Sequence, residues 1–383
     1  MADASMTIRV TMMGPARVGK TTLLTAILEN ARALLAGTPV TIRPTDIPTE
    51  ERLRKNDNEL TADLLAGEFR AGSLSGTREV SRYCMSISPG VAGEGLQMEF
   101  LDFPGGLLIP SERNARPVEW GEIQSFLRVS TAMLIPVDAV VLMESKSLDE
   151  KRAVPDLLGL GDVRNVAEEW AINRKLNSDQ PGTLIVSPVK CESYFTDNGN
   201  RGIGRMGTLF KRVQDIYGDV IDTVHSEAPN VQIIYAPVDS IGCVELVKPR
   251  WRPTLNQSLE PDPEFLVRPP GRRRVLGADD VLVPLVRQVV TAGRQSAEYV
   301  SQMAEREEER ARRLAAMNFR EAADQFGFWN ELLSRVRGVT AQRQQLAMAR
   351  SAEAQEALQR LAEYDATLDK IANRPQGPRV RAL

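Results

Sequence analysis

The run of residues from Gly14 to Thr21 has side chains whose types and spacing could hold a chain of phosphate groups. Glycines in the run would let backbone amides turn inward around an anion, where a Cβ atom would block the concavity. Lys20 could reach the outer phosphate oxygens, and Thr21 could offer its hydroxyl to a Mg²⁺ ion. We expect phosphate contacts from Gly14, Arg17, Val18, Gly19, Lys20, Thr21 and Thr22.

The elements on either side of this run would have to turn it toward a ligand. Residues 7 to 13 are rich in apolar and β-branched side chains, which predicts a short buried strand that leads into a turn at Gly14. Apolar side chains recur at helical spacing from Thr21 to Leu35, which predicts a helix with the positive end of its dipole at the loop. Strand, glycine loop and helix are the context in which this pattern is identified as a P-loop.

A second candidate element lies at Asp102, Phe103, Pro104 and Gly105, at the end of a predicted strand that starts at Leu96. A carboxylate at a strand end could hold the water shell of Mg²⁺, and the amide of Gly105 could contact a terminal phosphate. Alone, such a sequence is a turn. Together with the P-loop it predicts a nucleotide sensor, with Asp102 near the metal.

The remaining pattern predicts an α/β fold with a doubly wound, mostly parallel sheet, because candidate strands and helices alternate along the chain. Continuous apolar runs indicate strands that are covered on both faces. Further strands are predicted at 80–87, 96–102, 139–143, 183–188 and 231–236, and helices at 122–134, 163–177, 208–226 and 279–290.

The chain after this sheet changes character. We expect a P-loop domain at 1–294 that contains a proline- and arginine-rich insertion at 246–277. Residues 295–374 are dense in helix-forming residues and predict a helical or coiled-coil arm, and 375–383 are expected to be a disordered tail. Apolar residues of the arm recur with heptad spacing at Ala354, Ala357, Leu361, Tyr364, Leu368 and Ile371.

Composition excludes several classes of protein. Hydrophobic residues make up 42% of the chain, charged residues 26%, and the net charge is -3, so no excess of positive charge predicts a nucleic-acid partner. Apolar stretches fall short of the roughly 20 residues that cross a bilayer, so a membrane role is not expected. Three widely spaced cysteines are interpreted as reduced thiols, and we expect a cytoplasmic protein.

With these motifs in place, the chain resembles a Ras-like P-loop GTPase of the TRAFAC class over roughly residues 6 to 292. Its size and helical tail are similar to those of bacterial members described as double-GTPase-like. The resemblance implies that Thr77, which precedes the predicted strand at 80–87, is a switch threonine that binds Mg²⁺ with Thr21 and Asp102. Ser73 and Ser75 are alternatives for that role.

The resemblance also implies a base-reading site after the strand at 183–188. Lys190 would lie along the purine ring, and Glu192 would accept the guanine N1 and N2 protons, as an aspartate does in the family. Val189 replaces the usual asparagine or threonine, and glutamate is longer than aspartate. Ser240 resembles part of the family's last base-contacting loop.

The function that the resemblance implies is a GTP- and GDP-binding switch with slow Mg²⁺-dependent hydrolysis. Lys20, Thr77 and Gly105 would form its catalytic group, and the helical arm would bind a protein partner or a second copy. Gly106 follows Gly105 where Ras-type enzymes carry a water-orienting glutamine, so we expect weak intrinsic activity. Two alternatives stay open: an ATPase on the same fold, and a dynamin-like scaffold or membrane-remodelling protein suggested by aromatic residues at 326–333.

Overall fold

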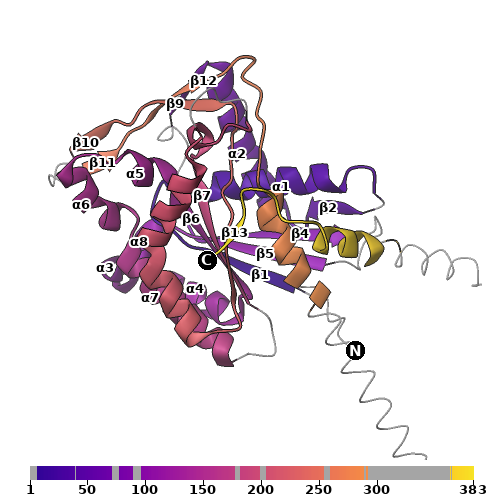
Figure 1. Cartoon of the computed structure of the whole chain (residues 1–383). Coiled ribbons are helices and arrows are strands. Elements are labelled where there is room, and N and C mark those ends of the chain that lie inside the picture. The colour runs from indigo at the N-terminus through magenta and orange to yellow at the C-terminus, as the bar shows by residue number, and fades with distance from the viewer. Residues whose placement is uncertain are drawn as a thin grey trace, which may run out of the picture.

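An eight-stranded sheet with the strand order β13-β8-β7-β6-β1-β5-β4-β2 forms the centre of the molecule (Figure 1). The computed structural model describes residues 7–38, 40–70, 77–88, 96–176, 182–198, 204–253, 259–288, 290–291, 363 and 365–383. The strands of the central sheet are β1 (Thr7–Met12), β2 (Thr41–Pro44), β4 (Ser81–Ser88), β5 (Leu96–Asp102), β6 (Ala132–Asp138), β7 (Thr183–Val189), β8 (Gln232–Tyr235) and β13 (Arg381–Ala382).

The pairing of these strands confirms the predicted doubly wound sheet. Strands β8, β7, β6, β1 and β5 run parallel. At one side β4 pairs antiparallel with β5 and β2 pairs antiparallel with β4, and at the other side β13 pairs antiparallel with β8. Strand β1 lies between β5 and β6, so the chain winds outward in both directions from it. A parallel sheet of this order that opens with a strand, a glycine loop and a helix has the α/β fold of P-loop nucleotide-binding proteins.

Helices cover both faces of this sheet (Figure 1). Side chains that alternate along each strand enter two separate apolar cores, as Leu134 and Met133 do on β6. Helix α1 and the helical residues 279–288 contribute to the first core, and α4, α7 and α8 contribute to the second. The helices are α1 (Lys20–Leu35), α2 (Ile47–Leu65), α3 (Pro110–Ala115), α4 (Pro117–Val129), α5 (Ala139–Glu144), α6 (Leu148–Leu157), α7 (Leu160–Leu176) and α8 (Met206–Glu227), with short 3-10 turns η1 (Gly105–Leu108) and η2 (Glu192–Tyr194).

The prediction of a strand at 139–143 is wrong. These residues belong to α5, and the strand of this region, β6, ends just before them at Asp138. The Asp138 carboxylate accepts hydrogen bonds from the amides of Val140 and Val141 at 3.0 and 3.2 Å, and so caps the helix. The apolar run continues through both elements, and periodicity alone does not separate a buried strand from a buried helix.

Smaller strands lie outside the central sheet, with β9 and β12 near α2 and with β10 and β11 near α6 (Figure 1). A three-stranded sheet has the order β3-β12-β9, and β10 pairs with β11 as a hairpin. All of these strands except β3 lie in or overlap the proline- and arginine-rich segment 246–277. Their bounds are β3 (Glu68–Arg70), β9 (Val244–Lys248), β10 (Trp251–Pro253), β11 (Leu259–Pro261) and β12 (Glu264–Val267).

The prediction of a disordered tail at 375–383 is also wrong. Strand β13 at the end of this segment pairs antiparallel with β8, and the preceding Arg379 and Val380 are both buried. Proline, glycine and arginine give the segment the composition of a solvated tail. A single sequence does not reveal the carboxylates that meet Arg379 in the fold.

Most of the predicted arm lies outside the described residues, namely 292–362 and 364, and so do the aromatic residues at 326–333. Residues 365–372 are helical, and Leu368 and Ile371 join the core cluster that contains Leu285. The last part of the heptad pattern therefore packs on the sheet domain of this same chain. No helix among the described residues is both long and apolar enough to cross a membrane.

Candidate nucleotide-binding site

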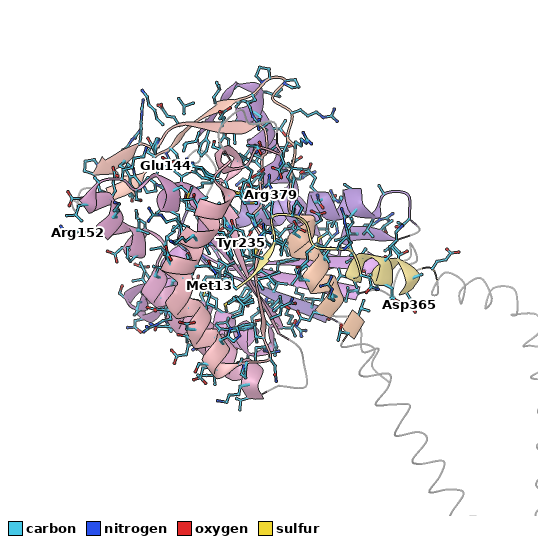
Figure 2. All side chains as sticks on the ribbon, in the orientation of Figure 1. Met13, Glu144, Arg152, Tyr235, Asp365 and Arg379 are labelled. Carbon is cyan, nitrogen blue, oxygen red and sulfur yellow. The ribbon has the colours of Figure 1, made fainter. Side chains whose placement is uncertain are left out.

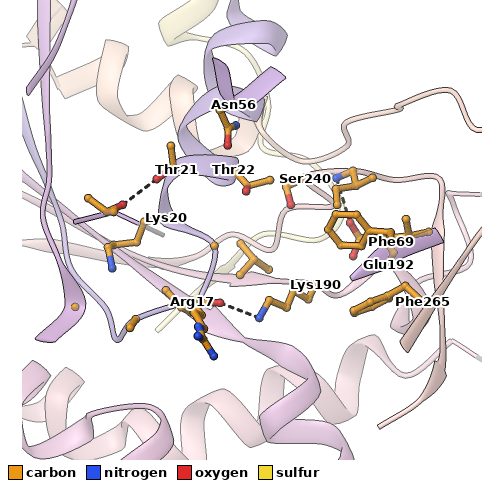
Figure 3. A pocket seen from close by; sticks show the side chains of 18 of the residues that line it. Arg17, Lys20, Thr21, Thr22, Asn56, Phe69, Lys190, Glu192, Ser240 and Phe265 are labelled. Atoms are coloured by element: carbon orange, nitrogen blue, oxygen red, sulfur yellow. Dashed lines mark hydrogen bonds between the residues drawn. The ribbon is translucent and has the colours of Figure 1, made fainter. Parts of the chain in front are cut away.

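A cavity of about 570 Å³ opens where the parallel strands end, and the P-loop lies along one side of it (Figure 3). Its other walls come from the loops that follow β5, β7 and β8 and from side chains of β3 and β12. This volume lies within the roughly 300–1,000 Å³ that is typical of small-molecule sites. Ligands of open α/β sheets bind at the carboxyl ends of the strands, and the cavity is in that position.

The backbone of the P-loop is bent for binding an anion. Arg17 and Gly19 both have left-handed conformations, with φ of 62° and 107°, and Lys20 begins α1 directly after them. Glycine adopts this conformation without steric cost, whereas arginine does so rarely. Successive amides in such a loop turn toward a common centre at the positive end of a helix, which is the arrangement that binds phosphate.

Lys20 lies inside the loop rather than in solvent. Its Nζ donates hydrogen bonds to the carbonyl oxygens of Gly14 at 2.9 Å and Pro15 at 3.1 Å. Burial lowers the pKa of Lys20, and the negative charge of Asp102 opposes that shift. A polyanion in the cavity would favour the charged amine in the same way.

The three predicted metal ligands meet at one point. Thr21 Oγ1 and Thr77 Oγ1 both donate to Oδ2 of Asp102, at 2.8 and 2.9 Å, and the two hydroxyls are 3.1 Å apart. The other carboxylate oxygen, Asp102 Oδ1, is buried without a hydrogen-bond partner. A buried, unsatisfied carboxylate oxygen beside two hydroxyls fits the all-oxygen donor set of Mg²⁺.

Among the described residues, no three or more histidine, cysteine, aspartate and glutamate side chains gather as a metal-binding cluster. A metal here would therefore depend on Asp102, the two hydroxyls, water and ligand phosphates, which is the manner in which Mg²⁺ is usually held. Ser73 and Ser75, the alternatives to Thr77, lie outside the described residues.

Gly105 packs directly on the P-loop. A Cβ atom at this position would overlap the amide nitrogen of Ala16 and the carbonyl carbon of Pro15. Only a glycine fits this contact, and it brings the start of η1 to the end of the cavity that the P-loop lines. The following side chain, Leu107, is buried in the second core and so points away from the cavity.

Lys190 connects the loop after β7 to the P-loop. Its Nζ donates to the carbonyl oxygen of Arg17 at 3.0 Å and to Asp138 Oδ2 at 2.5 Å, and its stem lines the cavity (Figure 3). The side chain of Arg17 turns the other way, is 72% exposed, and lies 3.7 Å from Glu260. Arg17 thus offers its backbone, and not its guanidinium, to this side of the site.

Glu192 and Ser240 lie in the wall at the far end from the P-loop. Oε1 of Glu192 accepts hydrogen bonds from the amides of Ile241 and Gly242 at 3.2 and 3.3 Å, which ties the loop after β7 to the loop after β8. Burial and the nearby charge of Asp239 raise the pKa of Glu192. This carboxyl therefore organises the two loops as well as lining the cavity, a role that sequence reasoning did not anticipate.

Two phenylalanines in this wall were missed by sequence reasoning. Phe69 on β3 and Phe265 on β12 contact each other edge to face, with ring centroids 5.8 Å apart, and both line the cavity near Glu192 (Figure 3). Their flat apolar surfaces suit the packing of a planar ring. The signal in the sequence is weak, because each lies on a strand of at most four residues within a segment that resembles a loop. Arg78, next to Thr77, is a further cavity residue that was not predicted.

Comparisons with known proteins add little to this geometry. No protein-family model matches the chain, and no curated protein matches it. One similar solved structure is that of Methanosarcina barkeri Roco2 RocCORdC bound to GDP, which is 12% identical over 61% of this chain and 43% of that chain. The chain thus spans less than half of that structure. The TM-score is 0.22, so this likeness supports neither a family nor an activity, and the fold assignment rests on the sheet order and the P-loop.

Proposed function

We propose that this chain is a Mg²⁺-dependent guanine-nucleotide switch that binds GTP and hydrolyses it slowly. The observation that supports this most is that the hydroxyls of Thr21 and Thr77 both donate to the carboxylate of Asp102, beside the buried amine of Lys20. These side chains come from the P-loop helix, from the segment before β4 and from the end of β5. A metal at this point would tie all three segments to a bound triphosphate.

Each residue of the phosphate end has a role in this proposal. In the run from Gly14 to Gly19, the backbone N–H groups of every residue except Pro15 are available to the phosphates, and Lys20 contacts the outer phosphate oxygens. Thr21, Thr77 and Asp102 hold Mg²⁺, which when bound neutralises charge on the phosphate oxygens. The amide of Gly105, which lies against the P-loop, would contact the terminal phosphate, so loss of that phosphate would release the segments that carry Thr77 and Gly105.

The proposal of slow hydrolysis is supported by the residues that line the cavity. Of the described residues 103–115, Gly105 lines the cavity, while Leu107 is buried elsewhere and Glu112 lies exposed on α3. A glycine has no side chain with which to orient water. We therefore propose turnover by the isolated chain below the ~1 s⁻¹ at the lower edge of typical enzyme rates. A partner or a second copy, recruited through the arm, would accelerate it.

We propose a preference for guanine because the chain resembles TRAFAC-class GTPases. Lys190 and the pair Phe69 and Phe265 would pack on the purine, and Glu192 and Ser240 would meet its polar edge. The alternative is an ATPase on the same fold. It is favoured by one observation, the hydrogen bonds that Glu192 Oε1 already accepts from two backbone amides. A scaffold or membrane-remodelling role has no observation in its favour among the described residues.

The experiment that tests this function is a titration of the full chain with GTP and with ATP, each with and without Mg²⁺. We expect GTP to bind at least about tenfold more tightly than ATP. Lys20→Ala should abolish binding of both while its circular dichroism spectrum stays unchanged. Lys55→Ala, which removes an exposed lysine of α2, is the matched control and should bind as the wild type does.

Two results would count against the proposal in different ways. If folded Lys20→Ala bound GTP with wild-type affinity, the phosphate site would be wrongly placed. If the wild-type chain bound ATP more tightly than GTP, the phosphate site would stand and the guanine preference would be replaced by the ATPase alternative.

A further inference from the structure

Arg379, near the C-terminus, is a charged side chain in the interior of the molecule. It is 3% exposed, and Figure 2 shows it near Tyr235 of β8. Arginine is almost never buried to this degree unless it is paired. The partners of Arg379 must therefore explain why this charged side chain is buried.

The partners of Arg379 come from two different loops. Its Nε donates to Asp197 Oδ2 at 2.9 Å, and its Nη2 donates to Asp197 Oδ1 and, at 2.8 Å, to Asp239 Oδ2. The guanidinium also stacks over the ring of Phe195, 3.9 Å from its centroid. Asp197 and Phe195 belong to the loop after β7, and Asp239 belongs to the loop after β8. One arginine thus holds both loops.

These are the loops that carry the proposed base-contacting residues. Asp239 directly precedes Ser240, and its Oδ1 accepts a hydrogen bond from Cys191 Sγ at 3.3 Å. Cys191 lies between Lys190 and Glu192 in the sequence. Asp239 is fully buried, so removal of Arg379 would leave its carboxylate without a positive partner, which is a costly state in a protein interior.

The segment that carries Arg379 is short and is attached at the edge of the central sheet. Strand β13 contains only Arg381 and Ala382 and pairs at an edge of the central sheet, with β8. Before it, the amide of Gly377 donates to Asp280 Oδ1 at 2.7 Å. Short edge segments of this kind open locally at a lower free energy than the core of a fold.

We propose that residues 375–383 act as a clamp on the two base-contacting loops, with Arg379 as its positioning residue, so that displacement of the segment speeds nucleotide release. This inference rests on the proposed function. Arg379 does not line the cavity, and it acts through Asp239 and Asp197 on the loops that hold the base. By linkage, bound nucleotide and the docked segment stabilise each other.

The test is the dissociation rate of GDP carrying a fluorescent ribose label, chased from the full chain with excess unlabelled GDP. We expect Arg379→Ala to release GDP at least about tenfold faster than the wild type, because loss of the buried partner of Asp239 would loosen the two loops that contact the base. Arg379→Lys, which keeps the charge without the planar fork, should give an intermediate rate. Arg381→Ala is the matched control, since its guanidinium bonds only to carbonyls of its own segment among the described contacts.

Pyrophosphate, as a second ligand, distinguishes a positioning role of Arg379 from a general loss of the fold. Pyrophosphate occupies the P-loop without a base, so its affinity should stay within about twofold of wild type in all of these variants. Equal weakening of pyrophosphate and GDP by Arg379→Ala would overturn the clamp, as would an unchanged GDP release rate.

A milder variant covers the case in which Arg379→Ala does not fold. Asp197→Asn alters a partner whose side chain is 51% exposed, and it should raise the GDP release rate by about threefold. An unchanged rate in this variant would overturn the clamp while leaving GDP binding intact. A wild-type chain that bound neither GDP nor pyrophosphate would instead overturn the proposed function and the clamp with it.

Discussion

The two ends of the cavity are built in different ways. The phosphate end comes from one strand-loop-helix unit, from β1 to α1, completed by Thr77, Asp102 and Gly105. The end that we propose to hold the base, called the base end, draws on four separate stretches that line the cavity, at Phe69, 190–192, 240–244 and Phe265, and on Arg379 behind them. The first is therefore determined mostly by local sequence, and the second by the folding of the whole domain.

This difference predicts that substitutions far from the P-loop in sequence should weaken contacts with the base and leave phosphate binding unchanged. Substitutions in or against the P-loop should instead weaken phosphate binding. The difference also places the C-terminal segment in the nucleotide-binding domain, although residues 292–362 separate the two in sequence.

The largest effect should come from removing the C-terminal segment. Truncation before residue 296 deletes Leu368, Ile371 and Val380 from the first core, together with Arg379. Burial of three such apolar side chains is worth about 5 kcal/mol, which is comparable with the whole stability of many domains. We expect the truncated chain to unfold at a much lower temperature than the full chain in a thermal melt.

The matched control for truncation is an internal deletion of residues 296–360 joined by a flexible linker, which keeps residues 361–383. This variant should melt close to the full chain and still bind GDP. If truncation and internal deletion had the same melting temperature, the C-terminal segment would not belong to the domain.

Outside the P-loop itself, Gly105→Ala should be the most damaging single change at the phosphate end. The added methyl group would overlap the P-loop backbone at Ala16, so either the loop or η1 must shift. We expect a loss of at least about 2 kcal/mol in GTP binding, and similar weakening of pyrophosphate. Gly106→Ala, whose new Cβ would have no atom within 4 Å, should bind both ligands normally.

At the base end, Phe265→Ala should separate the two ligands. Loss of the aromatic wall removes packing from a planar base, so GDP affinity should fall by about tenfold while pyrophosphate affinity is unchanged. Leu266→Ala, at an exposed position on the same strand, is the control. Calorimetry of both ligands with both variants gives the comparison, and equal losses for GDP and pyrophosphate would contradict it.

The same contrast explains which features could be predicted from the sequence. Contiguous motifs were sufficient to locate the P-loop and Asp102, and alternating strand and helix patterns predicted the doubly wound sheet that the structure confirms. Thr77 came from a family resemblance, and the structure brings it next to Thr21 and Asp102. The roles of these residues stay predictions until nucleotide binding is measured.

The features that sequence reasoning missed depend on contacts between distant segments. Phe69 and Phe265 meet only because β3 pairs with β12. Arg379 is recognisable as an interior residue only once Asp197 and Asp239 are known to surround it. The strand predicted at 139–143 failed for a different reason, since the apolar run conceals the helix cap at Asp138.

We propose that Thr21, Thr77 and Asp102 form a metal site for a bound triphosphate. The measurement that tests it most directly is a Mg²⁺ titration of GTP and GDP binding by the wild type and by Thr77→Ala, whose side chain is only partly buried. We predict that Thr77→Ala weakens Mg²⁺-GTP binding by about tenfold and leaves GDP within about twofold of wild type. Thr77→Ala with wild-type Mg²⁺ dependence for GTP would contradict the account.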